Sequence, residues 1–158
     1  MSLSNLDRAY IAGFLDADGS IYVQLKPNET YKYKFQVAVN VVFYQSVKEK
    51  KFMYDLKKLI KKGYIRERTD GIIEYIIGDE KSIVEVLIGV KSYLRLKRKQ
   101  ADLMLEILEI KKNVKSAKDF LRLAKKVDLF KDLNYSKKRK HDYFSVKKVL
   151  QREELLTP

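Results

Sequence analysis

Two carboxylates separated by a single residue, Asp16 and Asp18, end an apolar stretch and precede Gly19. At the end of a helix such carboxylates lie against the negative pole of the helix dipole, at a cost of a few tenths of a kcal/mol to ~1 kcal/mol. Carboxylate oxygens are suitable ligands for divalent metal ions. The pair indicates a candidate metal site, although an Asp-Ala-Asp-Gly turn without a chemical role fits the spacing equally well.

The element that must position these carboxylates is a helix, predicted to begin near Asn5 and to run to about Asp16. Ala9, Gly13 and Ala17 recur every four residues and form a seam of very small side chains along this helix. A second helix can approach closely along such a seam, so that two copies of the chain would bring their carboxylates together. The alternative is that small residues merely fit a crowded core.

The composition favours a polyanionic partner, because 34 Lys and Arg stand against 21 Asp and Glu and give a net charge of +13. Nucleic acid is the first candidate. An anionic membrane surface is the alternative, but the positive residues are spread over the predicted strands and several helices instead of one basic amphipathic helix, and no apolar run approaches the ~20 residues of a membrane span. The absence of cysteine excludes disulfides and thiolate sites, and one histidine, His141, excludes a multi-histidine site within one chain. The N-terminal residues lack the layout of a secretory signal, so we expect an intracellular protein.

A length of 158 residues suits one core, and we expect a single domain over residues 1–158. The predicted strands cover residues 20–26, 31–44, 64–68 and 72–77. The predicted helices after the first cover residues 46–62, 82–94, 99–112, 117–130 and 145–156. Ser116 with Asp119 resembles a capping box for the helix over residues 117–130, and a turn at Asp70-Gly71 is predicted between the last two strands. This order predicts an α+β fold with helices on one face of an antiparallel sheet, a core over about residues 5–112 and a helical and basic-loop extension over 113–158.

The strand predicted over residues 31–44 alternates apolar with polar residues. The apolar residues are predicted to face the core: Phe35, Val37, Val39, Val41 and Phe43. Amides, Lys and Tyr on the opposite face can reach base edges, since a β-ribbon fits the major groove of DNA. A half-exposed sheet also has a polar face without any ligand. Arg66 and Arg68 leave a similar choice open between guanine readout and a solvated Arg–Glu pair across the hairpin.

The string IAGFLDADG, residues 11–19, resembles the signature of the LAGLIDADG homing endonucleases. The segments Lys26-Pro27-Asn28 and Leu96-Lys97-Arg98-Lys99-Gln100-Ala101 are similar to segments of the single-motif, homodimeric branch of that family, in the same order. Together the similar parts cover about residues 8–110. The resemblance implies the LAGLIDADG fold, an αββαββα core whose saddle-shaped antiparallel sheet binds DNA.

The same resemblance implies a metal site at the dimer axis. The last acidic residue of the motif, here Asp18, would be the catalytic metal ligand, with the Ala17 carbonyl as a second ligand. Asp16 would help to end the helix and would not bind metal. Because the chain holds one motif, two carboxylates require a homodimer, whose implied interface residues are Ala9, Ala12, Gly13, Asp16 and Ala17.

Three further polar residues are implied around the metal. Gln45 matches the residue that orients solvent, and Lys97 matches the basic residue of the active site. Where relatives have an arginine four residues after the glutamine, this chain has Glu49. We expect Lys48 to substitute, because it would lie one helical turn from Gln45.

The residues implied to contact DNA share the polar sheet face and its turn. They are Tyr22, Gln24, Lys26, Asn28, Thr30, Tyr31, Lys34, Gln36, Asn40, Tyr44, Arg66, Arg68 and Glu74. A basic loop near the C-terminus adds Lys137, Lys138, Arg139 and Lys140.

The expected function is therefore that of a site-specific homing endonuclease that cuts both strands of a near-palindromic duplex with Mg²⁺, as a homodimer, and leaves 3′ overhangs. Mn²⁺ is expected to substitute, and Ca²⁺ to support binding without cleavage. The expected location is an archaeal or bacterial cytoplasm or the organelle of an intron host, with neither a membrane nor a small molecule as partner. The alternative is a nucleic-acid-binding protein that does not cleave, either an RNA maturase or a DNA regulator, for which Glu49 is the only support.

Overall fold

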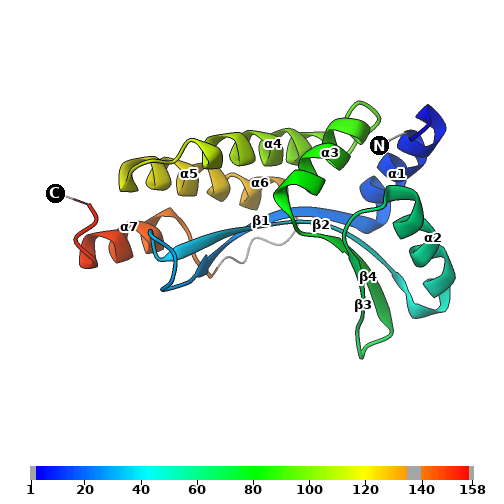
Figure 1. Ribbon diagram of the computed structural model, residues 1–158, viewed down its shortest axis with the longest axis horizontal. Helices are drawn as coiled ribbons and strands as arrows, with labels where there is room; N and C mark the ends of the chain where they lie inside the picture. The colour runs from blue at the N-terminus through cyan, green and yellow to red at the C-terminus, as the bar shows by residue number, and fades with distance from the viewer. Residues whose placement is uncertain (1–2, 135–139, 157–158) are drawn as a thin grey trace. The chain divides into compact units, whose positions relative to one another are not determined.

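The computed structural model describes residues 3–134 and 140–156. Its strands are β1 (Gly19–Pro27), β2 (Phe35–Ser46), β3 (Tyr64–Glu67) and β4 (Ile72–Ile77), which form one sheet in the order β1-β2-β4-β3. Its α-helices are α1 (Asn5–Asp18), α2 (Lys50–Ile60), α3 (Glu80–Val90), α4 (Arg98–Lys112), α5 (Ala117–Asp128), α6 (Phe130–Leu133) and α7 (Tyr143–Arg152), shown in Figure 1. The α+β class and the order of the main elements are confirmed.

The chain divides into two compact units. One comprises Met1–Ile21 and Val39–Asp102, and the other comprises Tyr22–Ala38 and Leu103–Pro158. The expectation of a single domain stays a prediction. Among the described residues, no helix combines the length and apolar composition needed to cross a membrane.

In the first unit, α1 begins with a capping box in which the Ser4 hydroxyl accepts a hydrogen bond from the Asp7 amide, while the Asp7 carboxylate accepts from the Ser4 amide. The helix ends where the Gly19 amide donates to the Leu15 carbonyl. A Cβ at position 19 would lie 2.8 Å from that carbonyl oxygen, so the chain can leave the helix this closely only at a glycine. The helix is two residues longer than predicted, and Asp16 and Asp18 both lie in its last turn.

Stacked aromatic rings hold α1 against the sheet within this unit. The ring of Phe14 stacks on Phe43 of β2, and Phe43 stacks on Tyr75 of β4, with centroids 5.6 Å apart in both pairs. Phe43 is opposite Tyr75 in the antiparallel β2–β4 pairing, and both are fully buried. The Tyr75 hydroxyl donates to the Lys62 carbonyl at 2.6 Å, which satisfies the polar atom of this buried ring. In Figure 1 the turn of the β3–β4 hairpin points away from α1 and α3.

The helix predicted over residues 46–62 is interrupted. A 3₁₀ turn covers Val47–Glu49 and α2 follows it, ending where Lys61 adopts a left-handed conformation with φ of 60°. The buried side chains of α2 are Met53, Leu56 and Ile60. The ring of Phe52 is half-buried and contacts the rings of Tyr10 and Phe14 of α1.

In the second unit, β2 begins at Phe35 and not at Tyr31 as predicted. The reason is a longer turn, in which the Asn28 side chain accepts hydrogen bonds from the amide and hydroxyl of Thr30. Lys34 takes a left-handed conformation with φ of 61° before the strand starts. The alternation that follows is confirmed: the predicted core residues of β2 are all buried.

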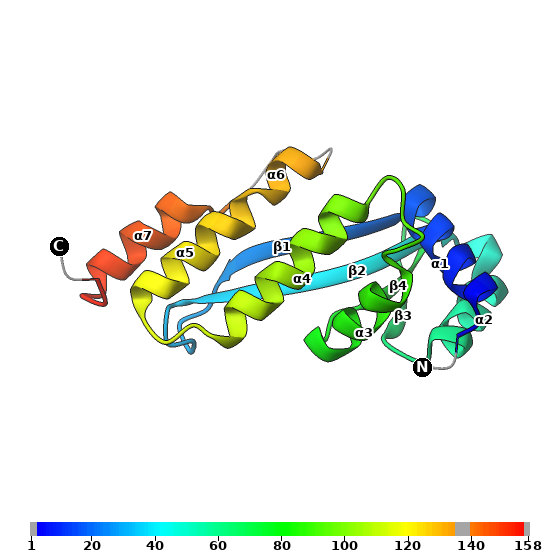
Figure 2. The ribbon, with the colours of Figure 1, turned by 90° about the horizontal axis from the view of Figure 1, so that it is seen from above.

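In the second unit, α5 and α7 begin within two residues of the predicted positions, but α5 ends at Asp128 instead of residue 130 and α7 ends at Arg152 instead of residue 156. The Ser116 and Asp119 capping box that opens α5 is present as expected. Figure 2 shows α5 and α7 side by side, and these helices pack against each other. The ring of Phe120 in α5 stacks on Tyr33 with centroids 5.1 Å apart, which attaches the turn before β2 to a helix.

Candidate active site and nucleic-acid interface

The last turn of α1 presents Ala17 and Asp18 to solvent, while Asp16 is half-buried. The two carboxylates of the motif are therefore not equivalent. Asp18 leaves its oxygens accessible at the end of the helix. The geometry makes Asp18 the carboxylate of this pair that can take a ligand from outside the chain.

The Asp16 carboxylate is instead bound by backbone amides of a distant segment. Its Oδ2 accepts from the amides of Arg95 at 2.7 Å and Leu96 at 3.1 Å, and its Oδ1 accepts from the amide of Lys97 at 2.9 Å. Charge-assisted hydrogen bonds to consecutive amides stabilise a carboxylate strongly. Asp16 thus joins the end of α1 to the segment that precedes α4, an interaction that no local pattern predicts.

Lys97 is the residue that this arrangement brings to the motif. Its Nζ donates to the backbone carbonyl of Asp16, and its side chain is half-buried. Burial lowers the pKa of Lys97, while the nearby charges of Asp16 and Asp18 act in the opposite direction. The Lys97 ammonium therefore lies at the end of α1, where the charges of both carboxylates act on it. Its role as the basic residue of the site stays a prediction.

The donor set at this end of α1 consists of oxygen atoms, which suits Mg²⁺ and Ca²⁺ rather than thiophilic metals. Over residues 3–134 and 140–156, no group of three His, Cys, Asp or Glu side chains is placed to hold a metal ion. One chain therefore offers too few carboxylates for a complete site. The residues present fit a divalent cation only if a second copy, water or a phosphate supplies the remaining ligands.

An exposed stripe of α1 runs toward this end of the helix. Ala9, Gly13 and Ala17 lie on it together with two large side chains, Leu6 and Tyr10, which are 83% and 54% exposed. A Cβ added at Gly13 would meet no atom of the chain within 4 Å, so packing within the chain does not require a glycine there. The seam interpretation is thus favoured over the crowded-core interpretation.

Ala12 departs from the expected interface. Its side chain is fully buried within its own chain, on the face of α1 that carries Ile11 and Leu15. A partner helix cannot reach it, because consecutive residues of a helix point in different directions. Asp16 remains at the edge of the stripe, where it helps to line a hollow of about 520 Å³ with Ala9, Gly13 and the segment before α4.

Gln45 and Lys48 lie at the end of β2 and just beyond it. Gln45 is opposite Ile73 in the sheet, and its Oε1 accepts from the Ser46 amide at 2.9 Å. Lys48 is exposed in the 3₁₀ turn, so it does not lie one helical turn from Gln45 as the sequence argument assumed. In the described part of the chain, neither residue has a hydrogen bond or an ion pair with Asp18.

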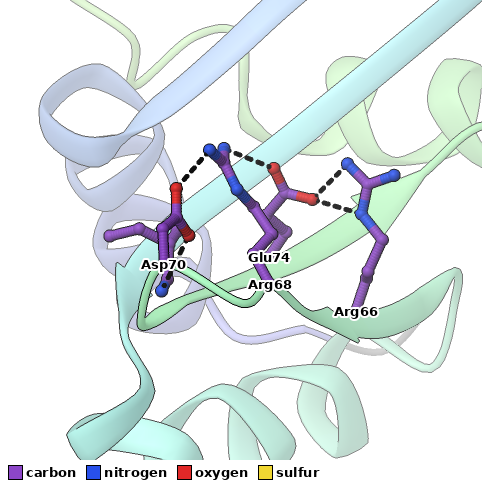
Figure 3. A network of polar contacts seen from close by, with 5 residues as sticks. Arg66, Arg68, Asp70 and Glu74 are labelled. Atoms are coloured by element: carbon purple, nitrogen blue, oxygen red, sulfur yellow. Dashed lines mark hydrogen bonds and ion pairs between the residues drawn. The ribbon is translucent and has the colours of Figure 1, made fainter.

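A polar row crosses three strands of the first unit, because Tyr44 of β2 is opposite Glu74 of β4 and Glu74 is opposite Arg66 of β3. The Glu74 side chain is only 5% exposed, and its Oε2 accepts from the Arg66 Nε at 2.6 Å. The other oxygen, Oε1, accepts from Arg68 at 3.3 Å, and Arg68 also binds Asp70, as Figure 3 shows. Asp70 was missed as part of this network.

The Arg–Glu pairing across the hairpin is therefore present, but it is not fully solvated as the simpler interpretation held. Glu74 is covered by two guanidinium groups whose side chains are 58% and 44% exposed. Glu74 is thus poorly placed to contact a base itself. It holds the side chains of Arg66 and Arg68, which remain about half exposed.

The other expected contact residues have varied surroundings. Tyr22, Gln36, Asn40 and Tyr44 are half-buried, whereas Gln24 and Lys26 are exposed. Tyr31 and Lys34 lie in the turn and not on the strand, and Lys34 pairs with Glu29 at 3.7 Å. Lys140 is exposed, while Lys137, Lys138 and Arg139 lie outside the described residues.

Comparison with known families decides the classification. The model of the LAGLIDADG endonuclease family matches residues 11–107. The chain belongs to this family. The resemblance carried by residues 11–19 is therefore confirmed.

Two curated relatives support the assignment. The DNA endonuclease I-CreI of Chlamydomonas reinhardtii is 38% identical over 142 residues, which cover 89% of this chain and 86% of the relative. The DNA endonuclease I-CvuI of Chlorella vulgaris is 36% identical over 127 residues, which cover 78% of this chain and 79% of the relative. Both relatives are matched over most of their length.

Solved structures confirm the LAGLIDADG fold. I-CvuI bound to the I-CreI target in the presence of magnesium, with its DNA not cleaved, superimposes with a TM-score of 0.91 at 32% identity, over 96% of this chain and 97% of that chain. I-CvuI bound to its own target in the presence of calcium gives the same values. The archaeal intron-encoded homing endonuclease I-Vdi141I in complex with DNA has a TM-score of 0.85 at 19% identity, over 96% and 99% of the two chains, which supports the fold alone.

Proposed function

We propose that the protein is a site-specific DNA endonuclease of the homing type. Two copies would bind a long, near-palindromic duplex and hydrolyse both strands with Mg²⁺, leaving 3′ overhangs. The observation that carries the proposal is the end of α1, where the Lys97 ammonium binds the Asp16 carbonyl two residues before the exposed Asp18, beside an exposed seam of small residues. Relatives 38% and 36% identical to this chain are DNA endonucleases.

The seam of α1 would bring two copies together. Ala9, Gly13 and Ala17 allow a close approach of two helices, and Leu6 and Tyr10 would be covered in the same contact. A two-fold pairing places the two Asp18 side chains at corresponding positions of one interface. The target would then have matching half-sites, because each chain presents the same contact residues to its own half.

Asp18 and the Ala17 carbonyl are the proposed metal ligands of each chain. A bound Mg²⁺ supplies an activated water and neutralises negative charge that develops on the phosphate. Lys97 places its ammonium close to Asp18, where it would stabilise the same charge. Gln45 would orient solvent, and Lys48 would serve in place of the arginine that relatives have near this position.

The remaining proposed roles concern binding. The residues of the sheet face and turn other than Glu74 would contact DNA, and the Lys140 region would add a phosphate contact. Mn²⁺ would substitute for Mg²⁺, and Ca²⁺ would support binding without cleavage, because it prefers a larger and more flexible ligand shell. The protein would act inside the cell or organelle that holds its target DNA.

A cleavage assay on a randomised duplex library, with both cut ends sequenced, tests the proposal. We expect Mg²⁺-dependent cuts at one near-palindromic sequence, and Asp18→Asn should abolish them while DNA affinity in Ca²⁺ is retained. Asp132→Asn, which makes the same chemical change at an exposed residue of α6, is the matched control and should cut normally. Cleavage by Asp18→Asn at the wild-type rate would refute the assigned role, and binding in Ca²⁺ with no product in Mg²⁺ would favour the non-cleaving alternative.

A further inference from the structure

The Asp16 carboxylate has an unusual position for a residue in the last turn of a helix. The dipole of α1 disfavours a negative charge there. The charge is balanced by amides that come from 79 to 81 residues further along the chain. Three consecutive amides, those of Arg95, Leu96 and Lys97, all donate to this one carboxylate.

These bonds hold a segment that packs little by other means. Arg95 is exposed and Leu96 is 73% exposed, so side-chain burial contributes little to its order. The segment precedes α4, whose first internal hydrogen bond runs from the Ala101 amide to the Lys97 carbonyl. Asp16 therefore fixes the position of the backbone of residues 95–97, directly before α4.

Both the backbone amide and the side-chain ammonium of Lys97 donate hydrogen bonds to Asp16. Its backbone amide donates to the Asp16 Oδ1, and its Nζ donates to the Asp16 carbonyl. A lysine side chain has high rotational freedom when it is free. The two bonds together hold its ammonium at the last turn of α1, the turn that also carries Asp18.

We propose that Asp16 is a positioning residue for Lys97: its carboxylate holds the backbone of residues 95–97 so that the Lys97 ammonium stays next to Asp18. The inference rests on the proposed function, in which Lys97 acts on the reacting phosphate. It gives the first carboxylate of the motif a role in the rate of cleavage without contact with metal or DNA. Preorganised charges are effective because they need not be ordered during the reaction.

A double-mutant cycle with Asp16→Asn and Lys97→Met tests this role. Asparagine keeps the shape of Asp16 but loses one acceptor oxygen and the charge. We expect Asp16→Asn to lower the single-turnover cleavage rate by about 10- to 100-fold, since a misplacement of about 1 Å is worth about 100-fold. DNA affinity in Ca²⁺ should stay within about threefold, because both oxygens of the Asp16 carboxylate are already bound by backbone amides of its own chain.

The decisive comparison is made in the absence of the Lys97 ammonium. If Asp16 acts through that group, Asp16→Asn should change the rate of the Lys97→Met protein by less than about threefold, although thermal unfolding should show the same loss of stability in both backgrounds. Asp79→Asn is the matched control, because Asp79 also accepts a backbone amide, that of Ser82 at 2.8 Å, but does so at the start of α3. It should lower stability without a change in cleavage rate.

Several outcomes separate this inference from the proposed function. A rate loss from Asp16→Asn that multiplies that of Lys97→Met overturns the inference, because Asp16 then acts independently. Full cleavage by Lys97→Met refutes the proposed role of Lys97 itself. Where Asp16→Asn does not fold, Asp16→Glu keeps the charge and moves it by one methylene, and cleavage by this variant at the wild-type rate also overturns the positioning role.

Discussion

Replacing Glu74 by glutamine would remove the negative charge that lies between Arg66 and Arg68. Loss of one partner of a fully buried ion pair costs about 3–5 kcal/mol, whereas exposed pairs contribute about 0–1 kcal/mol. Glu74 itself is buried, but the two arginine side chains are 58% and 44% exposed and are partly screened by water. We therefore expect Glu74→Gln to lower the free energy of unfolding by about 1–2 kcal/mol.

Thermal unfolding measures this cost. For a chain of this length, about 1–2 kcal/mol corresponds to a decrease in Tm of about 2–8 °C. The control is Glu109→Gln, since Glu109 pairs with Lys112 through side chains that are 68% and 60% exposed, and it should change the free energy of unfolding by less than about 0.5 kcal/mol. A Glu74→Gln protein as stable as this control would show that the buried carboxylate does not hold the hairpin together.

The same substitution should alter DNA binding in a defined direction. With Glu74 neutral, Arg66 and Arg68 lose their shared partner and gain freedom to pair with phosphates. We expect tighter binding to DNA of unrelated sequence, and a steeper dependence of log Kd on log salt, by up to about 0.9 for each additional phosphate neutralised. A salt slope identical to that of the wild type would refute the view that Glu74 restrains these arginines.

Two further predictions concern the helix seam and helix capping. Gly13→Leu should leave the fold of one chain intact, because an added Cβ meets no atom within 4 Å, but it should block dimerisation as measured by analytical ultracentrifugation; Gly89→Leu, at another open helical glycine, is the control and should not affect assembly. The pKa of Asp119 is lowered by its hydrogen bonds to the Ser116 hydroxyl and to backbone amides, so its stabilising contribution is complete above its ordinary pKa of 3.8 and is lost as pH falls through the folded-state pKa. Urea unfolding from about pH 5 to about pH 2.5 should show the stability difference between wild type and Asp119→Asn decreasing below about pH 4, and a difference that grows in acid would contradict this.

Patterns that repeat over short distances predicted much of the fold. The period of two in β2 placed Phe35 to Phe43 in the core because a strand alternates its faces throughout its length. The Ser116 and Asp119 capping box marked the start of α5, since both partners lie within one turn. The Asp70-Gly71 pair marked the turn between β3 and β4, because glycine readily adopts a positive φ, and Gly71 has a φ of 80° there.

Features that depend on distant contacts were not predictable in this way. The sequence near Pro27 signals a turn, but the start of β2 at Phe35 depends on the conformation of Lys34 and on the stacking of Tyr33 on Phe120. The interruption of the helix before α2 likewise depends on a distant contact, because the Val47 amide donates to the carbonyl of Gly71 in the turn between β3 and β4. Periodicity contains no information about either contact.

In the candidate site, too, features set by a local pattern were predictable and features set by distant contacts were not. The resemblance of residues 11–19 to a family signature identified Asp18, and the structure leaves that side chain accessible. The role of Asp16 in holding residues 95–97 had no local signal, because its donors lie about 80 residues away and are backbone amides that every sequence possesses. For the same reason the burial of Glu74 beneath two arginines was visible only in the folded chain.

Each chain ends its first helix with a single accessible carboxylate, and this has a genetic consequence. In the proposed homodimer, each residue of the chain is present twice, once for each half of the target. A substitution that changes base preference therefore changes the preference for both half-sites. If the sequences of the two half-sites diverge, a single chain cannot adapt to each of them separately. Only duplication and fusion of the gene would allow the two halves to diverge separately.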